Sequence, residues 1–196
     1  VHSQAFHGLL GQVPGIRVFY PVQPKSVTEC YRKALAHRGV SIVMEPRRMY
    51  ELETAGLPRA VAPPMAQIIT LGDCVLDAAA AARELRQEKI TCNVIPVEDL
   101  RSAVSYFADV PCVLVDTSPT ADTVSIIACR LFQSGCSAVR FVVPPWEPLP
   151  AAAALEAGWY PSKEGIKNAI YEMLGKKTSG AVSPLEAADV GFRGPF

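Results

Sequence analysis

Short apolar runs alternate along most of the chain with longer segments in which apolar residues recur every three or four positions. The runs predict strands, and they lie at 16–20, 40–44, 67–71, 92–95, 112–115 and 138–143. The amphipathic segments predict helices between an N-cap at Ser26 and a stop at Gly39, and at 74–88, 123–132 and 163–174. Residues 97–107 read as a loop with a short helix.

This alternation predicts an α/β fold with a mostly parallel sheet that helices cover on both faces, because the strands are apolar almost throughout. The first strand, helix and strand predict a right-handed parallel crossover. From 51 to 64 the pattern gives way to Gly and Pro, which indicates a linker. We therefore expect a first part at 1–55, a second at 65–175, and a tail or linker at 176–196.

Composition narrows the class of protein. The 196 residues are 49% hydrophobic and 19% charged, with a formal net charge of zero. A neutral chain argues against nucleic-acid and anionic-membrane partners. No apolar run approaches the roughly 20 residues that span a bilayer, and the start of the chain lacks the pattern of a secretory signal. Together with the cysteines, which we expect to be reduced, these features predict a cytoplasmic protein.

The six cysteines form no CxxC pair, and no His lies at metal-ligand spacing from them. Several fall inside apolar runs, so we expect reduced cysteines acting as small core residues. The sequence also contains no phosphate-binding glycine loop and no nucleophile elbow. No metal site is predicted in this chain.

Three blocks in the first 50 residues form a pattern. They are His2-Ser3-Gln4, then Pro14-Gly15-Ile16-Arg17-Val18, then Glu45-Pro46-Arg47-Arg48-Met49-Tyr50. In order and spacing they resemble the beta subunit of the thiamine-diphosphate-dependent first component of 2-oxoacid dehydrogenases. That family carries a His-Ser-Gln tripeptide, then Pro-Gly-hydrophobic-Lys/Arg-Val, then Glu-Pro-Lys/Arg-x-x-Tyr.

Later blocks extend the resemblance to about residue 174. They are Asp99-Leu100-Arg101-Ser102, Val113-Leu114-Val115-Asp116 and Pro148-Leu149-Pro150. These are similar to blocks of the C-terminal domain that transketolases share with dehydrogenase beta subunits. The resemblance implies the second half of a transketolase-type pyrimidine-binding domain, followed by a transketolase C-terminal-type domain.

The resemblance also implies where the cofactor is held. In the family, the Glu that activates thiamine diphosphate lies upstream of the His-Ser-Gln tripeptide, and the diphosphate and Mg²⁺ site lies in the alpha subunit. We therefore expect a partner chain, or a missing N-terminal part, to hold thiamine diphosphate and Mg²⁺. Two explanations stay open: the chain is a fragment of a longer beta subunit, or the enzyme is naturally split within this domain.

By this resemblance the chain is a component of a split or multi-subunit enzyme and is not active alone. The enzyme would cleave a 2-oxo acid or a ketose and pass a two-carbon acyl or ketol unit to a lipoyl or carrier-protein thiol. Its partners would be a cofactor-binding alpha-type subunit and a lipoyl or acyl-carrier domain, in an α2β2-like hetero-oligomer. The alternatives are a non-catalytic assembly or docking subunit, and plain transketolase-type ketol transfer between sugars.

His2 is the candidate catalytic residue, since imidazole titrates near neutral pH and the matching family histidine faces the cofactor-bound intermediate. The alternative is that His2 is a poorly ordered terminal residue without a role. Ser3 and Gln4 are candidates to hydrogen-bond around His2, or to orient the following segment. His7 is a further substrate or interface candidate, and we expect it to lie at the surface or at an interface.

Arg47 and Tyr50 follow a predicted strand, and ligands of parallel sheets gather outside the carboxyl ends of strands. They are therefore substrate or interface candidates, with a solvated linker as the alternative. We expect Asp99 and Arg101 to pair structurally. Trp146 and Trp159 lie near prolines and are equally consistent with an interface and with packing.

Overall fold

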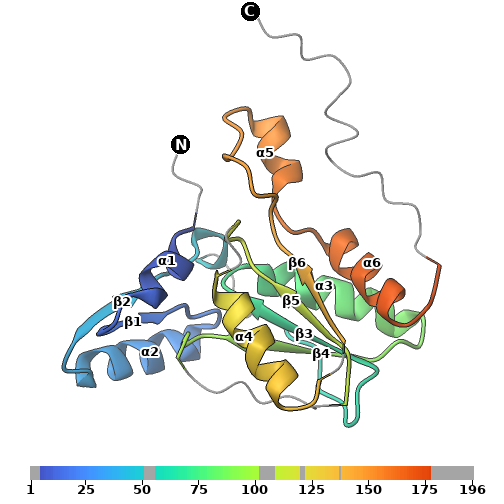
Figure 1. Cartoon of the computed structure of the whole chain (residues 1–196), viewed down its shortest axis with the longest axis horizontal. Coiled ribbons are helices and arrows are strands. Elements are labelled where there is room, and N and C mark those ends of the chain that lie inside the picture. The colour runs from blue at the N-terminus through green and yellow to red at the C-terminus, as the bar shows by residue number, and fades with distance from the viewer. Residues whose placement is uncertain (1–4, 51–55, 102–108, 120–121, 137, 178–196) are drawn as a thin grey trace, which may run out of the picture.

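Two parallel sheets organise the chain, for which the computed structural model describes residues 5–50, 56–101, 109–119, 122–136 and 138–177 (Figure 1). The small sheet pairs β1 (Ile16–Phe19) with β2 (Val40–Val43). The larger sheet has the order β4-β3-β5-β6. Its strands are β3 (Ala66–Leu71), β4 (Cys92–Val97), β5 (Cys112–Val115) and β6 (Val139–Val142). All pairs of named strands are parallel, which confirms the predicted α/β fold class.

Helices pack against the two sheets, and those of the second part of the chain cover both faces of the larger sheet. The helices of the described residues are α1 (His7–Gln12), α2 (Pro24–Ala36), α3 (Cys74–Gln87), α4 (Asp122–Gln133), α5 (Ala153–Trp159) and α6 (Lys163–Met173), with a 3-10 turn at Arg47–Met49. Helices α3 and α6 share one core cluster with one face of β3 and β5. Helix α4 packs on the other face with Leu71 and Leu114. Because both faces are covered, β3 is buried at every position, as its apolar sequence predicts.

The elements fall where the apolar pattern places them, apart from the short ones. Neither α1 nor α5 is predicted from periodicity, and residues 102–108 of the expected loop helix lie outside the described residues. The expected N-cap at Ser26 is wrong, because α2 begins at Pro24, a residue suited to the first helical position. The Ser26 hydroxyl instead accepts a hydrogen bond from the backbone N–H of Gln23 at 3.0 Å.

The predicted apolar stripe of α2 is only partly buried. Cys30 lies in the interior, whereas Tyr31 is 46% and Leu35 is 85% exposed. The helix therefore presents apolar side chains to the outside as well as to its own sheet.

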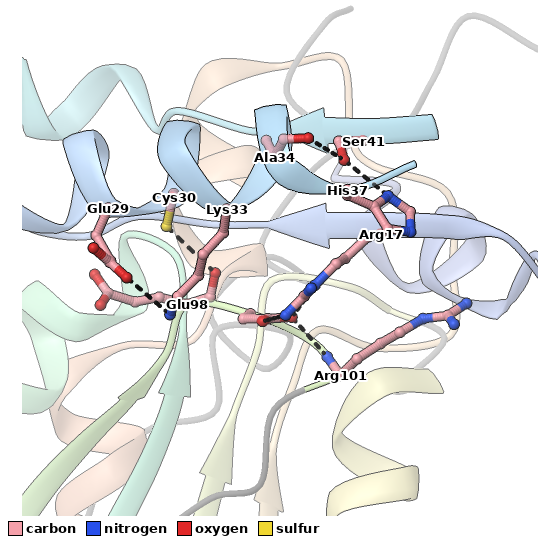
Figure 2. Close-up of polar contacts among 10 residues, drawn as sticks. Arg17, Glu29, Cys30, Lys33, Ala34, His37, Ser41, Glu98 and Arg101 are labelled. Carbon is pink, nitrogen blue, oxygen red and sulfur yellow. Dashed lines mark hydrogen bonds and ion pairs between the residues drawn. The ribbon is translucent and has the colours of Figure 1, made fainter. Parts of the chain in front are cut away.

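The loop after β4 joins the two sheets. The backbone N–H of Tyr20 donates to the Glu98 carbonyl at 2.8 Å, and that of Leu100 donates to the Val18 carbonyl at 3.2 Å. Arg17 forms an ion pair with Asp99 at 2.5 Å, and Figure 2 shows the Arg17 side chain reaching toward the loop that carries Glu98 and Arg101. Asp99 accepts a hydrogen bond from the backbone N–H of Arg101, so its role here is structural.

The described part of the predicted linker, residues 56–64, is bonded to the second part of the chain. The Asn93 side chain donates to the Val61 carbonyl and accepts from the Val61 N–H, both at 2.8 Å. Arg83 on α3 donates to the Gly56 carbonyl at 2.7 Å. In the described part of the chain, no helix is long and apolar enough to cross a membrane.

A charge cluster ties α3 to α6 and makes stability depend on pH. Glu84 accepts hydrogen bonds from Lys163 and Lys167, which lower the pKa of its carboxyl to about 2. Because the folded pKa lies below the unfolded value, the stabilisation is complete above about pH 4.5 and is lost as the pH falls toward 2.

We therefore expect Glu84→Gln to lower the melting temperature at pH 7 by a few degrees, with a smaller difference at pH 3. Thermal unfolding at both pH values measures this, and Glu172→Gln, at an exposed position of the same helix pair, is the matched control. An equal loss at the two pH values would contradict the linkage.

Candidate functional site

A pocket of about 910 Å³ lies where the carboxyl ends of strands from both sheets meet. Its lining comes from residues 44–48 after β2, from the start of α3 after β3, and from Thr117 after β5. Ala5 and Tyr20 add a wall from the first part of the chain, and Glu156 and Tyr160 add one from α5 and the residue after it. The carboxyl ends of parallel strands are the usual place for ligands, so this pocket is the candidate site.

Charged side chains of both signs line the pocket. Arg48 lies 3.4 Å from Asp73 and 3.2 Å from Asp77, across the boundary between the two sheets. Burial raises the pKa of Asp73, and Arg48 opposes this. Glu45 accepts a hydrogen bond from the Tyr31 hydroxyl at 2.8 Å.

Arg47 differs from Arg48 in its ion pairs. Within the described residues it forms no ion pair, while Arg48 is held by two carboxylates. An exposed guanidinium that lines a pocket and has no hydrogen-bond partner among the described residues is suited to a carboxylate or phosphate.

Tyr20 forms part of the inner wall. Its ring lies against Gly72, the first residue after β3, where the backbone has φ +52°. A Cβ atom at Gly72 would lie 2.3 Å from the Tyr20 ring, so the close approach requires glycine. Burial raises the pKa of the Tyr20 phenol, and the charges of Asp73, Cys74 and Asp116 add to the effect.

Behind Tyr20 lies a fully buried pair, His7 on α1 and Asp116 after β5. The His7 Nε2 atom lies 2.7 Å from Asp116 Oδ1, and neither side chain is exposed. The contact is not aligned as a hydrogen bond from the ring N–H. The same Asp116 oxygen accepts from the Ser118 backbone N–H at 3.2 Å, and the His7 ring packs on Tyr20 with centroids 5.2 Å apart.

The expectation that His7 lies at the surface or at an interface is therefore wrong. Helix α1 turns His7 and Gly8 inward, and Gly8 lies so close to α4 that a Cβ atom would sit 3.2 Å from Asp122. The absence of a side chain at Gly8 lets the helix approach closely enough to bury its neighbour.

The structure brings together only part of the predicted site. Arg47 lines the pocket, whereas Tyr50 is 67% exposed and is not among the lining residues. His2, Ser3 and Gln4 lie outside the described residues, and Ala5, the first described residue, lines the pocket.

Of the charged side chains that line the pocket, sequence reasoning missed Asp73, Asp77 and Glu156. Asp73 stands two positions after β3, so the rule that ligands gather at strand ends would have found it. Apolar periodicity does not mark Glu156 and Tyr160 as site residues, because α5 has only seven residues.

The described residues do not fit the Mg²⁺ and diphosphate of the expected cofactor. Across the described ranges, no three His, Cys, Asp or Glu side chains gather in a way that would hold a metal ion. Of the two guanidinium groups in the pocket lining, Arg48 is held by Asp73 and Asp77, so Arg47 alone would face the several charges of a diphosphate.

No protein-family model matches the chain, and no curated protein matches it in sequence. Solved structures do match. A split gene transketolase, described as an inactive beta4 tetramer, aligns with TM-score 0.65 and 18% identity over 87% of this chain and 61% of that chain. Transketolase from Leishmania mexicana aligns with TM-score 0.57 and 18% identity over 89% of this chain and 28% of that one.

A transketolase mutant from Pichia stipitis gives TM-score 0.58 and 16% identity, over 89% of this chain and 28% of that chain. The chain thus spans less than two thirds of the split-gene protein and under a third of the longer transketolases. At these identities the likeness concerns the fold. The chain has a mixed α/β fold of the transketolase C-terminal type, and its structural resemblance is to transketolases rather than to the 2-oxoacid dehydrogenase beta subunit in particular.

Proposed function

We propose that this chain is one component of a thiamine-diphosphate enzyme of the transketolase type, in which a partner chain holds the cofactor and this chain supplies part of the substrate pocket. One observation carries the proposal: in a transketolase-type fold, a pocket at the strand ends presents Arg47, which has no ion pair with any described residue. The reaction would cleave a ketose or a 2-oxo acid and transfer a two-carbon unit. Thiamine diphosphate and Mg²⁺ would come with the partner.

In this proposal Arg47 binds the anionic end of the substrate. Sugar phosphates and 2-oxo acids both carry a group that a guanidinium recognises with two parallel hydrogen bonds. Arg48 keeps the wall in place, because Asp73 and Asp77 hold it from the other sheet.

His2 is the proposed proton-transfer residue. It precedes the pocket-lining Ala5 by three positions, and three extended residues reach at most about 10 Å. A histidine at that distance can serve a substrate oxygen in or beside the pocket. Ser3 and Gln4 would orient it.

The partner would cover the first part of the chain. Large apolar side chains are exposed there on or next to both helices, in β2 and after the 3-10 turn that follows it. They are Phe6, Leu9, Val13, Tyr31, Leu35, Val40 and Tyr50. A two-stranded sheet is marginal by itself, and exposed apolar groups of this density mark a protein interface. The match in fold to a split gene transketolase, described as an inactive beta4 tetramer, supports this proposal, and an α2β2-like assembly would suit the chain.

The acceptor of the two-carbon unit distinguishes two candidate reactions. The sequence blocks around His2 and Arg47 resemble dehydrogenase beta subunits, which act with a lipoyl or carrier-protein thiol. The three matching structures described above are transketolases, which favours transfer between sugars. A docking subunit without catalysis is the third candidate, and the same experiment separates all three.

The test is to combine the chain with its cofactor-binding partner and follow both acceptors. Mass spectrometry measures loading of a lipoyl or carrier domain, and a coupled assay measures ketol transfer between sugar phosphates. Whichever acceptor is used, we expect His2→Ala to lower kcat while the complex still assembles. Full activity of His2→Ala would identify the chain as a docking subunit.

For Arg47→Ala we expect KM to rise about 10- to 100-fold with little change in kcat, because a charge-assisted hydrogen bond to the substrate is lost. Arg38→Ala removes an exposed arginine outside the pocket and should leave both constants unchanged. Equal kinetics for the two variants would remove Arg47 from the site.

A further inference from the structure

Two thiols meet at the amino end of the larger sheet, opposite the pocket. Cys112 is the first residue of β5, and Cys136 lies in the turn after α4. Their Sγ atoms are 3.8 Å apart, and the residues are 0% and 2% exposed. All six cysteines of the chain fall within the described residues and are free thiols, and this is the one pair with a thiol–thiol contact.

We propose that Cys112 and Cys136 are a redox-sensitive pair, which a small-molecule disulfide such as oxidised glutathione converts into an intrachain disulfide that ties β5 to the turn after α4. The proposal does not depend on the proposed function, since it requires neither cofactor nor partner.

The geometry needs little movement. At 3.8 Å the two sulfur atoms are already in contact, and a disulfide brings them to about 2.05 Å. Cys112 is fixed in a central strand, so the movement falls on Cys136. That residue follows Gly135, whose φ of +94° and open surroundings leave the turn free of side-chain packing at this point.

Oxidation leaves no buried carbonyl without a donor. In the reduced form both thiols donate to the Val110 carbonyl, at 3.3 and 3.7 Å, and Cys136 also lies 3.5 Å from the Ala138 carbonyl. After loss of the thiol protons, Val110 still accepts from the Gln67 side chain at 3.4 Å. Ala138 still accepts from the Cys112 backbone N–H at 2.9 Å. Oxidation therefore avoids the free-energy cost of leaving a buried carbonyl oxygen without a hydrogen-bond donor.

The chemistry is two thiol–disulfide exchanges. The Cys136 thiolate attacks one sulfur of oxidised glutathione, forming a mixed disulfide and releasing one glutathione thiolate. The Cys112 thiolate then attacks the Cys136 sulfur and releases the second. The protein loses two protons and two electrons, and the oxidant is reduced to two glutathione molecules.

Burial sets the rate. It raises the pKa of the Cys112 thiol to about 12, and the neighbouring Cys136 adds to the effect, so little thiolate exists at neutral pH. The reaction therefore proceeds through local opening of the turn that carries Cys136, and it is slow compared with reaction at an exposed thiol.

The test treats the isolated chain with oxidised glutathione, in native buffer and in urea below the unfolding transition, followed by peptide mass mapping without reduction. We expect a cross-link between the peptides that carry Cys112 and Cys136, with the loss of two hydrogen atoms. Exposed Cys129 is an internal control, because it should form a mixed disulfide first. The cross-linked chain should melt about 10 °C higher, since the bond closes a loop containing β5 and α4.

Two variants make the result decisive. Cys136→Ser should abolish both the cross-link and the rise in melting temperature, and Cys129→Ser should keep both. Recovery of Cys112 and Cys136 as free thiols in native buffer and in urea, after Cys129 is fully modified, would overturn the proposal. A cross-link of equal yield between other cysteines would overturn it as well.

Discussion

Replacing His7 with leucine is expected to destabilise the chain by about 3–5 kcal/mol, one of the two largest effects that the structure predicts. The substitution leaves the Asp116 carboxylate fully buried without its nearest basic group, which lies 2.7 Å away in the wild type. The Ser118 backbone N–H remains as a donor to the carboxylate, but it does not replace the imidazole. Urea denaturation followed by circular dichroism measures the loss as a lower midpoint at an unchanged slope.

His37→Leu is the matched control. The ring of this half-buried histidine forms one hydrogen bond among the described residues, with the Ser41 hydroxyl at 3.1 Å, and its loss should cost about 1 kcal/mol or less. A second variant tests the cause: the double substitution His7→Leu with Asp116→Leu should recover much of the stability, because it removes the stranded charge together with its partner. If His7→Leu costs no more than His37→Leu, the buried pair does not hold α1 in place.

The helices and strands of the larger sheet can be predicted from the sequence because each has a clear apolar pattern. The strand at 112–115 is an unbroken apolar run, and β5 occupies those residues. The helix expected at 163–174 has its apolar positions on one face, and α6 runs from Lys163 to Met173. A strand covered on both faces and a helix that packs on one of them must both bury apolar residues, so the apolar pattern predicts their place.

The candidate site is harder to predict because it is made by contacts between distant segments. His7 is buried by a six-residue helix whose two glycines give no helical signal. Arg48 and Asp73 meet across two separate sheets, and no pattern along the chain relates them. Position after a strand does single out Arg47, which is why this residue was found while the residues from α5 were not.

The described residues of the first part of the chain expose several large apolar side chains, although the sequence pattern predicts a buried face. The sequence pattern predicts an apolar stripe on α2, yet Leu35 and Tyr31 of that stripe are exposed in this chain. A sequence pattern reports that a face is suited to burial, and it does not say which molecule buries it. This mismatch between pattern and exposure is what the proposed partner chain would resolve.

Replacing Gly72 with alanine tests the wall of the pocket most directly. The glycine has φ +52°, and the new Cβ atom would lie 2.3 Å from the Tyr20 ring. The ring is 6% exposed and packed beneath His7, so it cannot move aside without disturbing the buried pair. Left-handed backbone strain of about 1–2 kcal/mol and overpacking of about 1–3 kcal/mol add to an expected loss of about 2–5 kcal/mol.

Gly175→Ala separates the two causes, because that glycine has a similar φ of +65° with no atom within 4 Å of the new Cβ. It should lose only the backbone contribution, about 1–2 kcal/mol, when measured by the same urea denaturation. In a Tyr20→Ala background the clash partner is absent, so Gly72→Ala should there cost no more than Gly175→Ala. A loss at Gly72 that stays the same with and without the tyrosine ring would show that the ring does not pack on the turn after β3, and the pocket would then need a different inner wall.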